Sequence, residues 1–136
     1  MSIETTAHAF FDACETGKGW EACAAYCKPG ATFSAQADAL GEITTLEAYS
    51  EWMKGLLVPL PDGHYELKAF SADTERGVVT AFAVFHGTHT VDGPVPATGQ
   101  KATSDYVYAM QFDGDKITHM TKIWNDGVAL KQLGWA

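Results

Sequence analysis

Four β-forming segments follow one another through the second half of the chain, and they leave few folds open to it. The segments are rich in β-branched and aromatic residues, and turn sequences separate them at Glu75-Arg76-Gly77 and Asp113-Gly114. Consecutive strands with such short connections pair antiparallel. The predicted strands cover residues 65–70, 78–90, 102–112 and 117–124, with a Gly/Pro-rich loop at 92–99.

The first half of the chain instead carries apolar residues at the spacing of amphipathic helices. Thr44-Thr45-Leu46-Glu47 matches a capping box, in which Thr44 accepts a hydrogen bond from the backbone N–H of Glu47. Pro29-Gly30 is expected to stop an earlier helix. The predicted helices cover residues 3–16, 20–27, 45–57 and 128–133, and a short strand covers 31–35.

Helices that precede a sheet must pack on one of its faces, which gives an α+β arrangement. The 136 residues suit a single domain over residues 1–136, and a chain of this size can bury a core without disulfides. The three cysteines, Cys14, Cys23 and Cys27, are therefore expected to be reduced and buried.

The charge balance excludes several classes of partner. The net charge is -8, with 17 acidic and 9 basic residues, so the surface repels phosphate groups. We expect no nucleic-acid partner and no membrane partner. No apolar stretch approaches the roughly 20 residues of a membrane-spanning helix, and the N-terminus lacks the pattern of a signal peptide. The sequence thus predicts a cytoplasmic protein.

Several local motifs, together with the order of the segments, resemble the SnoaL-like polyketide cyclases of the nuclear-transport-factor-2-like superfamily. The motifs are Gly87-Thr88-His89-Thr90, Pro96-Ala97-Thr98-Gly99, Asp113-Gly114-Asp115-Lys116-Ile117 and the closing stretch 123–134. The resemblance implies a cone-shaped, cystatin-like roll, in which a curved antiparallel sheet wraps around the N-terminal helices and an apolar cavity. It also implies a small hydrophobic ligand, no cofactor, and a homodimer formed through the sheet.

The last strand departs from the family pattern. Enzymes of this superfamily often carry a catalytic aspartate three residues before the position that matches Asn125, and that residue is Lys122 here. Met120-Thr121 replaces a common histidine-tryptophan pair, and Asn125 itself stands where many members have an aspartate. The general acid of the family therefore cannot be transferred to this chain.

The environment of Lys122 depends on the register of the last hairpin. A two-residue turn would place Asp105 opposite Lys122, whereas a three-residue turn would place Tyr106 there. If it faces the cavity, Lys122 is a candidate base or imine-forming lysine, with Asp105 beside it. If it faces outward, it forms a solvated salt bridge worth about 0–1 kcal/mol.

The histidines predict no metal site. His86 and His89 are three residues apart on a strand, so their side chains point to opposite faces. His89 is a candidate general acid or hydrogen-bond donor to a substrate carbonyl, and its alternative role is to fix the loop at 92–99. The two-residue turn would also set Tyr108 opposite His119, either inside the cone or at an exposed surface.

The candidate catalytic residues are thus His89, Lys122 and Asp105. Trp52 is offset from the apolar stripe of its helix, which is compatible with a place at a cavity mouth or a partner surface, and its alternative role is ordinary core packing. Asn125 has an alternative role as the cap of the last helical turn. The candidate substrate-binding residues are Trp52, Tyr106, Tyr108, Trp124 and Asn125.

Two functions fit these observations. The first is a cofactor-independent cyclase or isomerase that moves protons on a small hydrophobic carbonyl or polycyclic compound. The second is a non-catalytic ligand-binding or dimerisation domain that has lost the catalytic aspartate of the family. The second hypothesis is favoured by Lys122 and Asn125, and the first by the polar groups expected around the cavity.

Overall fold

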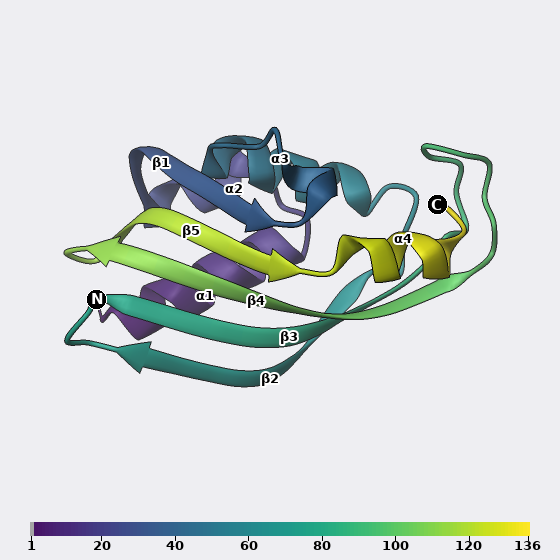
Figure 1. Cartoon of the computed structure of the whole chain (residues 1–136). Helices are drawn as coiled ribbons and strands as arrows, with labels where there is room; N and C mark the ends of the chain where they lie inside the picture. Colours follow the sequence, from purple (N-terminus) through teal and green to yellow (C-terminus); the bar gives the residue numbers. More distant parts are fainter. Residues whose placement is uncertain (1) are drawn as a thin grey trace.

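The computed structural model describes residues 2–136, which form one five-stranded sheet with helices packed against it (Figure 1). This is the α+β architecture that the order of segments predicts. The helices are α1 (Ile3–Glu15), α2 (Trp20–Cys23), α3 (Leu46–Leu56) and α4 (Asp126–Leu133), with short 3-10 turns η1 (Ala24–Tyr26) and η2 (Asp38–Leu40). The strands are β1 (Cys27–Gln36), β2 (His64–Asp73), β3 (Val78–Thr88), β4 (Lys101–Asp113) and β5 (Lys116–Trp124).

The strand order in the sheet is β1-β5-β4-β3-β2. The pairs from β2 to β5 are antiparallel, as their short connections predict. β1 departs from the expected antiparallel arrangement because it pairs parallel with β5, so the sheet is mixed. The whole β2–β5 meander separates these two strands in sequence, and no hairpin therefore fixes their relative direction.

The core lies between the concave face of the sheet and the helices α1, α2 and α3, which gather on one side of it in Figure 1. Alternate residues of β4 are buried, among them Tyr106, Tyr108 and Met110, and their neighbours along the strand are more exposed. Phe10 and Phe11 of α1 pack against this face. One-sided burial with period two is what an antiparallel sheet requires when only one face is covered.

Several predicted boundaries shift, each for a local reason. The N-cap of α3 is Thr45, whose side chain accepts from the N–H of Ala48, and the predicted cap at Thr44 is wrong. Thr44 instead accepts from Phe33 N–H through its backbone oxygen, which draws it into pairing beside β1. Pro29-Gly30 lies inside β1, since the helical segment already ends at Tyr26.

The register of the last hairpin differs from both predicted alternatives. Asp113 pairs with Lys116, which makes Gly114 and Asp115 the turn residues. A bulge then leaves Thr118 without a partner on β4, since the next pairs after Asp113–Lys116 are Phe112–Ile117 and Gln111–His119.

As a result Lys122 lies opposite Tyr108, and Trp124 lies opposite Tyr106. The expected pairs Asp105–Lys122, Tyr106–Lys122 and Tyr108–His119 do not form. Within residues 2–136 no helix has the length and apolar character needed to cross a membrane.

Gly114 offers a test of the hairpin. It has a φ of 64°, and a Cβ placed there would meet no atom within 4 Å, so Gly114→Ala should introduce backbone strain alone. We expect a loss of about 1–2 kcal/mol in the free energy of unfolding, measured by urea denaturation. Gly55→Ala in α3 is the matched control, because a Cβ there also meets nothing but φ is not positive. That control should gain about 0.5–1 kcal/mol, and equal effects of the two substitutions would contradict the turn geometry.

Candidate functional site

A pocket opens between the concave face of the sheet, α3 and the C-terminal segment. Its lining is mostly apolar, and its polar members include Glu15, Ser104, Tyr106 and Lys122. The centre of a water molecule can occupy about 50 Å³ of it, and the free space including the mouth is about 540 Å³. For comparison with the value of 50 Å³, the centre of a single buried water molecule needs only about 10–15 Å³. The pocket thus has room for a small guest. The aromatic residues that line it are Trp52, Phe85, Tyr106, Trp124 and Trp135.

The amine of Lys122 lies among aromatic rings in this pocket. Lys122 is 4% exposed, although lysine is almost never fully buried without a partner. Its Nζ atom lies 4.5 Å from the ring centroid of Trp124 and 5.5 Å from that of Trp52. Aromatic faces attract a cation at these distances, by about 2 kcal/mol or more where water is excluded. Nζ also lies 5.1 Å from the rings of Tyr49 and Tyr106, and 6.0 Å from that of Tyr108.

A chain of hydroxyl groups connects this amine to a buried carboxyl group. Lys122 Nζ donates to the hydroxyl of Tyr49 at 2.9 Å, and the hydroxyls of Tyr49 and Tyr108 are 2.7 Å apart. The hydroxyl of Tyr108 donates to Oε2 of Glu15. Glu15 is 2% exposed at the end of α1. The hydrogen-bond directions are mutually consistent, because each tyrosine can accept from one neighbour and donate to the next.

Burial sets the protonation behaviour of the chain. It lowers the pKa of Lys122, while the nearby Glu15 carboxylate and Cys14 thiol oppose that shift. Burial also raises the pKa of Tyr49 and of Tyr108, so both hydroxyls keep their protons. The amine is therefore closer to neutrality than an exposed lysine, and the tyrosines can pass a proton without becoming stable anions.

Tyr106 supplies a further polar group. Its hydroxyl is buried and has no hydrogen-bond partner among residues 2–136, although the residue lines the pocket. A buried hydroxyl without a partner typically costs 1–3 kcal/mol, which a ligand oxygen could recover. Ser104 also lines the pocket, and its hydroxyl accepts from the indole N–H of Trp124 at 3.2 Å, which leaves its own O–H proton able to donate.

The structure brings only some of the predicted site residues together at the pocket. Trp52, Tyr106, Lys122 and Trp124 line the pocket, and Tyr108 lies directly behind it. Asp105 is exposed on the outer face of the sheet, beside Asn125 in a shallow hollow. Asn125 accepts from Val128 N–H as the N-cap of α4, which confirms its predicted capping role.

His89 is fully buried outside the pocket lining. Its Nδ1 accepts from the indole N–H of Trp135 at 2.9 Å and from the backbone N–H of Thr98 at 3.2 Å. The hydroxyl of Thr98 in turn donates to the backbone oxygen of Leu133. His89 therefore ties the loop at 92–99 to the C-terminal segment, as its alternative role predicts.

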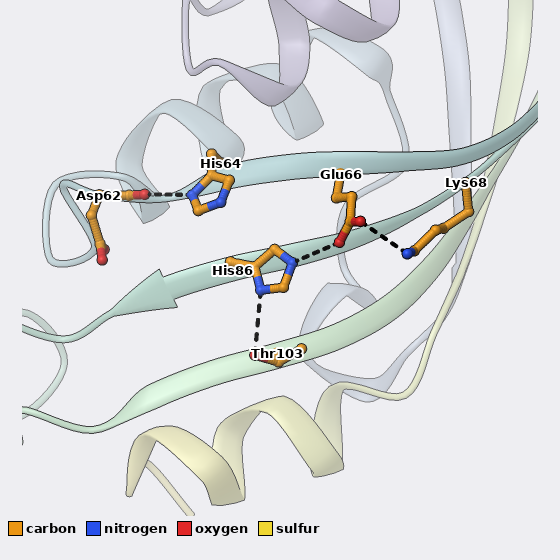
Figure 2. A network of polar contacts seen from close by, with 6 residues as sticks. All are labelled: Asp62, His64, Glu66, Lys68, His86 and Thr103. Atoms are coloured by element: carbon orange, nitrogen blue, oxygen red, sulfur yellow. Dashed lines mark hydrogen bonds and ion pairs between the residues drawn. The ribbon is translucent and has the colours of Figure 1, made fainter.

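The three other histidines of the sheet, His64, His86 and His119, lie on its outer face. His86 contacts the carboxylate of Glu66 at 3.2 Å and Thr103 at 3.4 Å, and its ring stacks against His64 (Figure 2). His119 contacts Thr32 at 2.7 Å instead of facing Tyr108. In the described part of the chain, no cluster of three or more histidine, cysteine or acidic side chains is arranged to hold a metal ion.

Sequence reasoning overlooked Glu15 and Tyr49 as site residues. A signal for Glu15 is present, because it lies four and eight residues after Phe11 and Ala7, on the apolar face of the first helix. A carboxyl group on such a face must be buried or find a partner. Tyr49 carries no comparable signal, since a tyrosine in an apolar stripe is ordinary core packing.

The comparisons with known proteins agree with this architecture. A model of the SnoaL-like domain matches residues 7–120. The chain belongs to the SnoaL-like family. A search of curated proteins gives no match.

Solved structures extend the likeness over nearly the whole SnoaL-like chain. IdmH from Streptomyces antibioticus, proposed to be a polyketide cyclase, is 18% identical with a TM-score of 0.77, covering 98% of this chain and 99% of its own. A proposed polyketide cyclase from Acidithiobacillus ferrooxidans is 24% identical with a TM-score of 0.78, covering 99% and 96%. A ketosteroid-isomerase-like protein from Catenulispora acidiphila, in complex with trimethylamine, is 19% identical with a TM-score of 0.71, covering 96% and 93%. These likenesses establish the fold and leave the reaction open.

The link between Lys122 and Glu15 can be tested by a double-mutant cycle. Lys122→Met removes the cation that compensates a buried carboxylate, and Glu15→Gln removes the carboxylate. Each single substitution is expected to cost about 3–5 kcal/mol of unfolding free energy at neutral pH. The double variant should lose less than the sum, by at least about 1 kcal/mol. Lys54→Met, exposed on α3, should change stability by less than about 0.5 kcal/mol, and additive single effects would show that the two groups are uncoupled.

Proposed function

We propose that this SnoaL-like domain binds a small, mostly apolar carbonyl compound in its pocket and catalyses proton transfer on it without a cofactor. The observation that carries the proposal is the amine of Lys122, which lines an aromatic pocket and is connected to Glu15 through two tyrosine hydroxyls. Isomerisation and cyclisation of carbonyl compounds both begin with such a proton transfer beside the carbonyl group.

The lining of the pocket favours a carbonyl ligand. Rings of Trp52, Trp124 and Phe85 would contact its hydrocarbon part. Lys122, Tyr106 and Ser104 can each donate to a carbonyl oxygen, and the hydroxyl of Tyr106 has no other partner among residues 2–136. A few polar groups in an apolar cavity orient a ligand by its one polar atom.

The chain of hydroxyls would connect the positive charge gained by the reacting amine to a compensating carboxylate. When Lys122 takes a proton from a carbon beside the carbonyl, its added charge is compensated by Glu15 through Tyr49 and Tyr108. A base is most effective when its pKa lies near the working pH, and burial moves Lys122 in that direction. The role of the family aspartate would thus be taken by a lysine on the same strand.

The second hypothesis, ligand binding without turnover, is favoured by the narrow interior of about 50 Å³. It is also favoured by the positions of His89 and Asp105, which lie outside the pocket lining. The Catenulispora acidiphila protein of this fold is in complex with trimethylamine, a compound of only four non-hydrogen atoms. Binding and turnover therefore need separate measurements.

Thermal shift and isotope exchange provide those measurements. Cyclohexanone at 100 times its dissociation constant should stabilise the protein by about 2.7 kcal/mol and raise the melting temperature by several degrees. In D2O the enzyme should speed exchange of the α-hydrogens of cyclohexanone, followed by NMR, and Lys122→Met should lose at least about tenfold of that rate. Lys54→Met should retain it. A thermal shift without exchange would support the binding hypothesis, and neither effect would contradict both.

The outer face of the sheet supports the proposed homodimer. Phe82, Val107 and Ile123 lie in register across β3, β4 and β5, and Phe82 and Ile123 are exposed. An apolar row that crosses three strands is a surface that a second copy could cover.

Charge introduced into this row should therefore separate the copies. Ile123→Lys is expected to convert a dimer into a monomer in light scattering after size exclusion, since an unpaired charge would be buried at the interface. Val58→Lys, at an apolar residue that is also exposed but lies after α3, is the control and should remain dimeric. A monomeric wild-type protein at high concentration would contradict the proposal.

A further inference from the structure

We propose that Lys122 forms a covalent imine with the carbonyl carbon of a small ketone or aldehyde bound in the pocket. This inference rests on the proposed function for the class of ligand, an apolar carbonyl compound. It adds a bond between ligand and protein, and it assigns Lys122 the role of a nucleophile. The geometry that points to it is a buried amine, on the wall of a cavity, with one oxygen neighbour and several aromatic ones.

The surroundings of Nζ satisfy an ammonium ion incompletely. An ammonium group has three N–H donors, and within residues 2–136 the one hydrogen-bond acceptor at Nζ is the hydroxyl of Tyr49. The remaining donors face aromatic rings, which attract a cation but satisfy it less than water does. A neutral amine has a free electron pair, and that pair is what attacks a carbonyl carbon.

The hydroxyl chain gives the departing proton a destination. The ammonium of Lys122 passes a proton to Tyr49, Tyr49 passes its own to Tyr108, and Tyr108 passes its own to Glu15. The result is a neutral amine and a neutral carboxylic acid, with no change in the total charge of the interior.

Imine formation then balances without any external reagent. The Nζ electron pair attacks the carbonyl carbon, and a proton moves from nitrogen to oxygen, which gives a carbinolamine. The proton held by Glu15 returns along Tyr108 and Tyr49, the hydroxyl group leaves as water, and nitrogen forms the C=N bond. A neutral amine, a neutral acid and a ketone have thus become an iminium ion, the Glu15 carboxylate and one water molecule.

Tyr106 completes the arrangement. Its buried hydroxyl lines the same pocket, and its ring centroid is 5.1 Å from Nζ. It can donate to the carbonyl oxygen while the carbon is attacked, which stabilises the negative charge that develops there. The resulting iminium ion would withdraw electrons from the neighbouring carbon and acidify its C–H bonds. Because the electron pair of Lys122 is then part of the C=N bond, the base for this proton would be the Glu15 carboxylate, which also lines the pocket, in place of the amine.

Reductive trapping tests the inference. Wild-type protein is incubated with cyclohexanone and sodium cyanoborohydride, which reduces an iminium ion to a stable secondary amine. Intact mass should then rise by one cyclohexyl group, and peptide mapping should locate it on Lys122. The exposed Lys54 is the internal comparison, and Lys122 should be labelled faster, because burial lowers its pKa and so raises the fraction of neutral amine.

Two further measurements distinguish Lys122 from an ordinary exposed lysine. Labelling of Lys122 should persist to lower pH than labelling of Lys54, although Glu15 and Cys14 face the amine and oppose its lowered pKa. Tyr49→Phe retains the lysine but interrupts the hydroxyl chain, so it should slow labelling of Lys122 and leave that of Lys54 unchanged.

The outcomes separate this inference from the proposed function. If cyclohexanone raises the melting temperature but Lys122 is labelled no faster than Lys54, the covalent step is overturned and non-covalent binding stands. If neither binding nor labelling occurs, both proposals fail. If Lys122→Met does not fold, the comparison of Lys122 with Lys54 in the wild-type protein still decides the matter.

Discussion

The amine of Lys122 has almost no contact with water, and this single constraint shapes much of the interior around it. Moving a charged amine into an apolar environment costs several kcal/mol unless the protein offers compensation. The compensation here has three parts: aromatic faces around Nζ, one hydroxyl that accepts from it, and a carboxyl group two hydroxyls away. Because none of these contacts is a direct ion pair, the amine can gain or lose its proton at a smaller cost than a lysine bound directly to a carboxylate.

That arrangement needs several elements to meet at one point. Glu15 ends α1, Tyr49 comes from α3, Tyr108 from β4 and Lys122 from β5. The site is thus built almost wholly on helices and strands, which hold side chains more tightly than loops do. His89 contributes from a distance, since it holds Trp135, a pocket-lining residue, against the end of the sheet. The pocket is therefore closed partly by tertiary contacts of the C-terminal segment.

The sequence predicts the fold well because the relevant signals are local. Alternation in the strands and helical spacing in α1 and α3 follow from which face is buried, and turn residues mark where strands end. The site is harder to predict because it depends on register. Both predicted registers paired Lys122 with the wrong neighbour, because the turn lies at Gly114-Asp115 and because neither register included the extra residue at Thr118. The chain of hydroxyls was also out of reach, because Tyr49 and Glu15 meet Tyr108 only after the helices dock on the sheet.

The unpaired Thr118 has a consequence for which side chains of β5 face the pocket. Before it, the odd-numbered Ile117 points into the core; after it, the even-numbered Met120, Lys122 and Trp124 do so. A strand has only two sides, so if Thr118 stayed in the chain but paired regularly with β4, the two sides would be exchanged for the rest of β5. An imidazole, a hydroxyl and an isoleucine would then enter the cone, and the amine would face solvent. Deleting Thr118 would instead make the pairing regular and leave Lys122 on the wall of the pocket, so it is the unpaired state of this residue that keeps the amine inside.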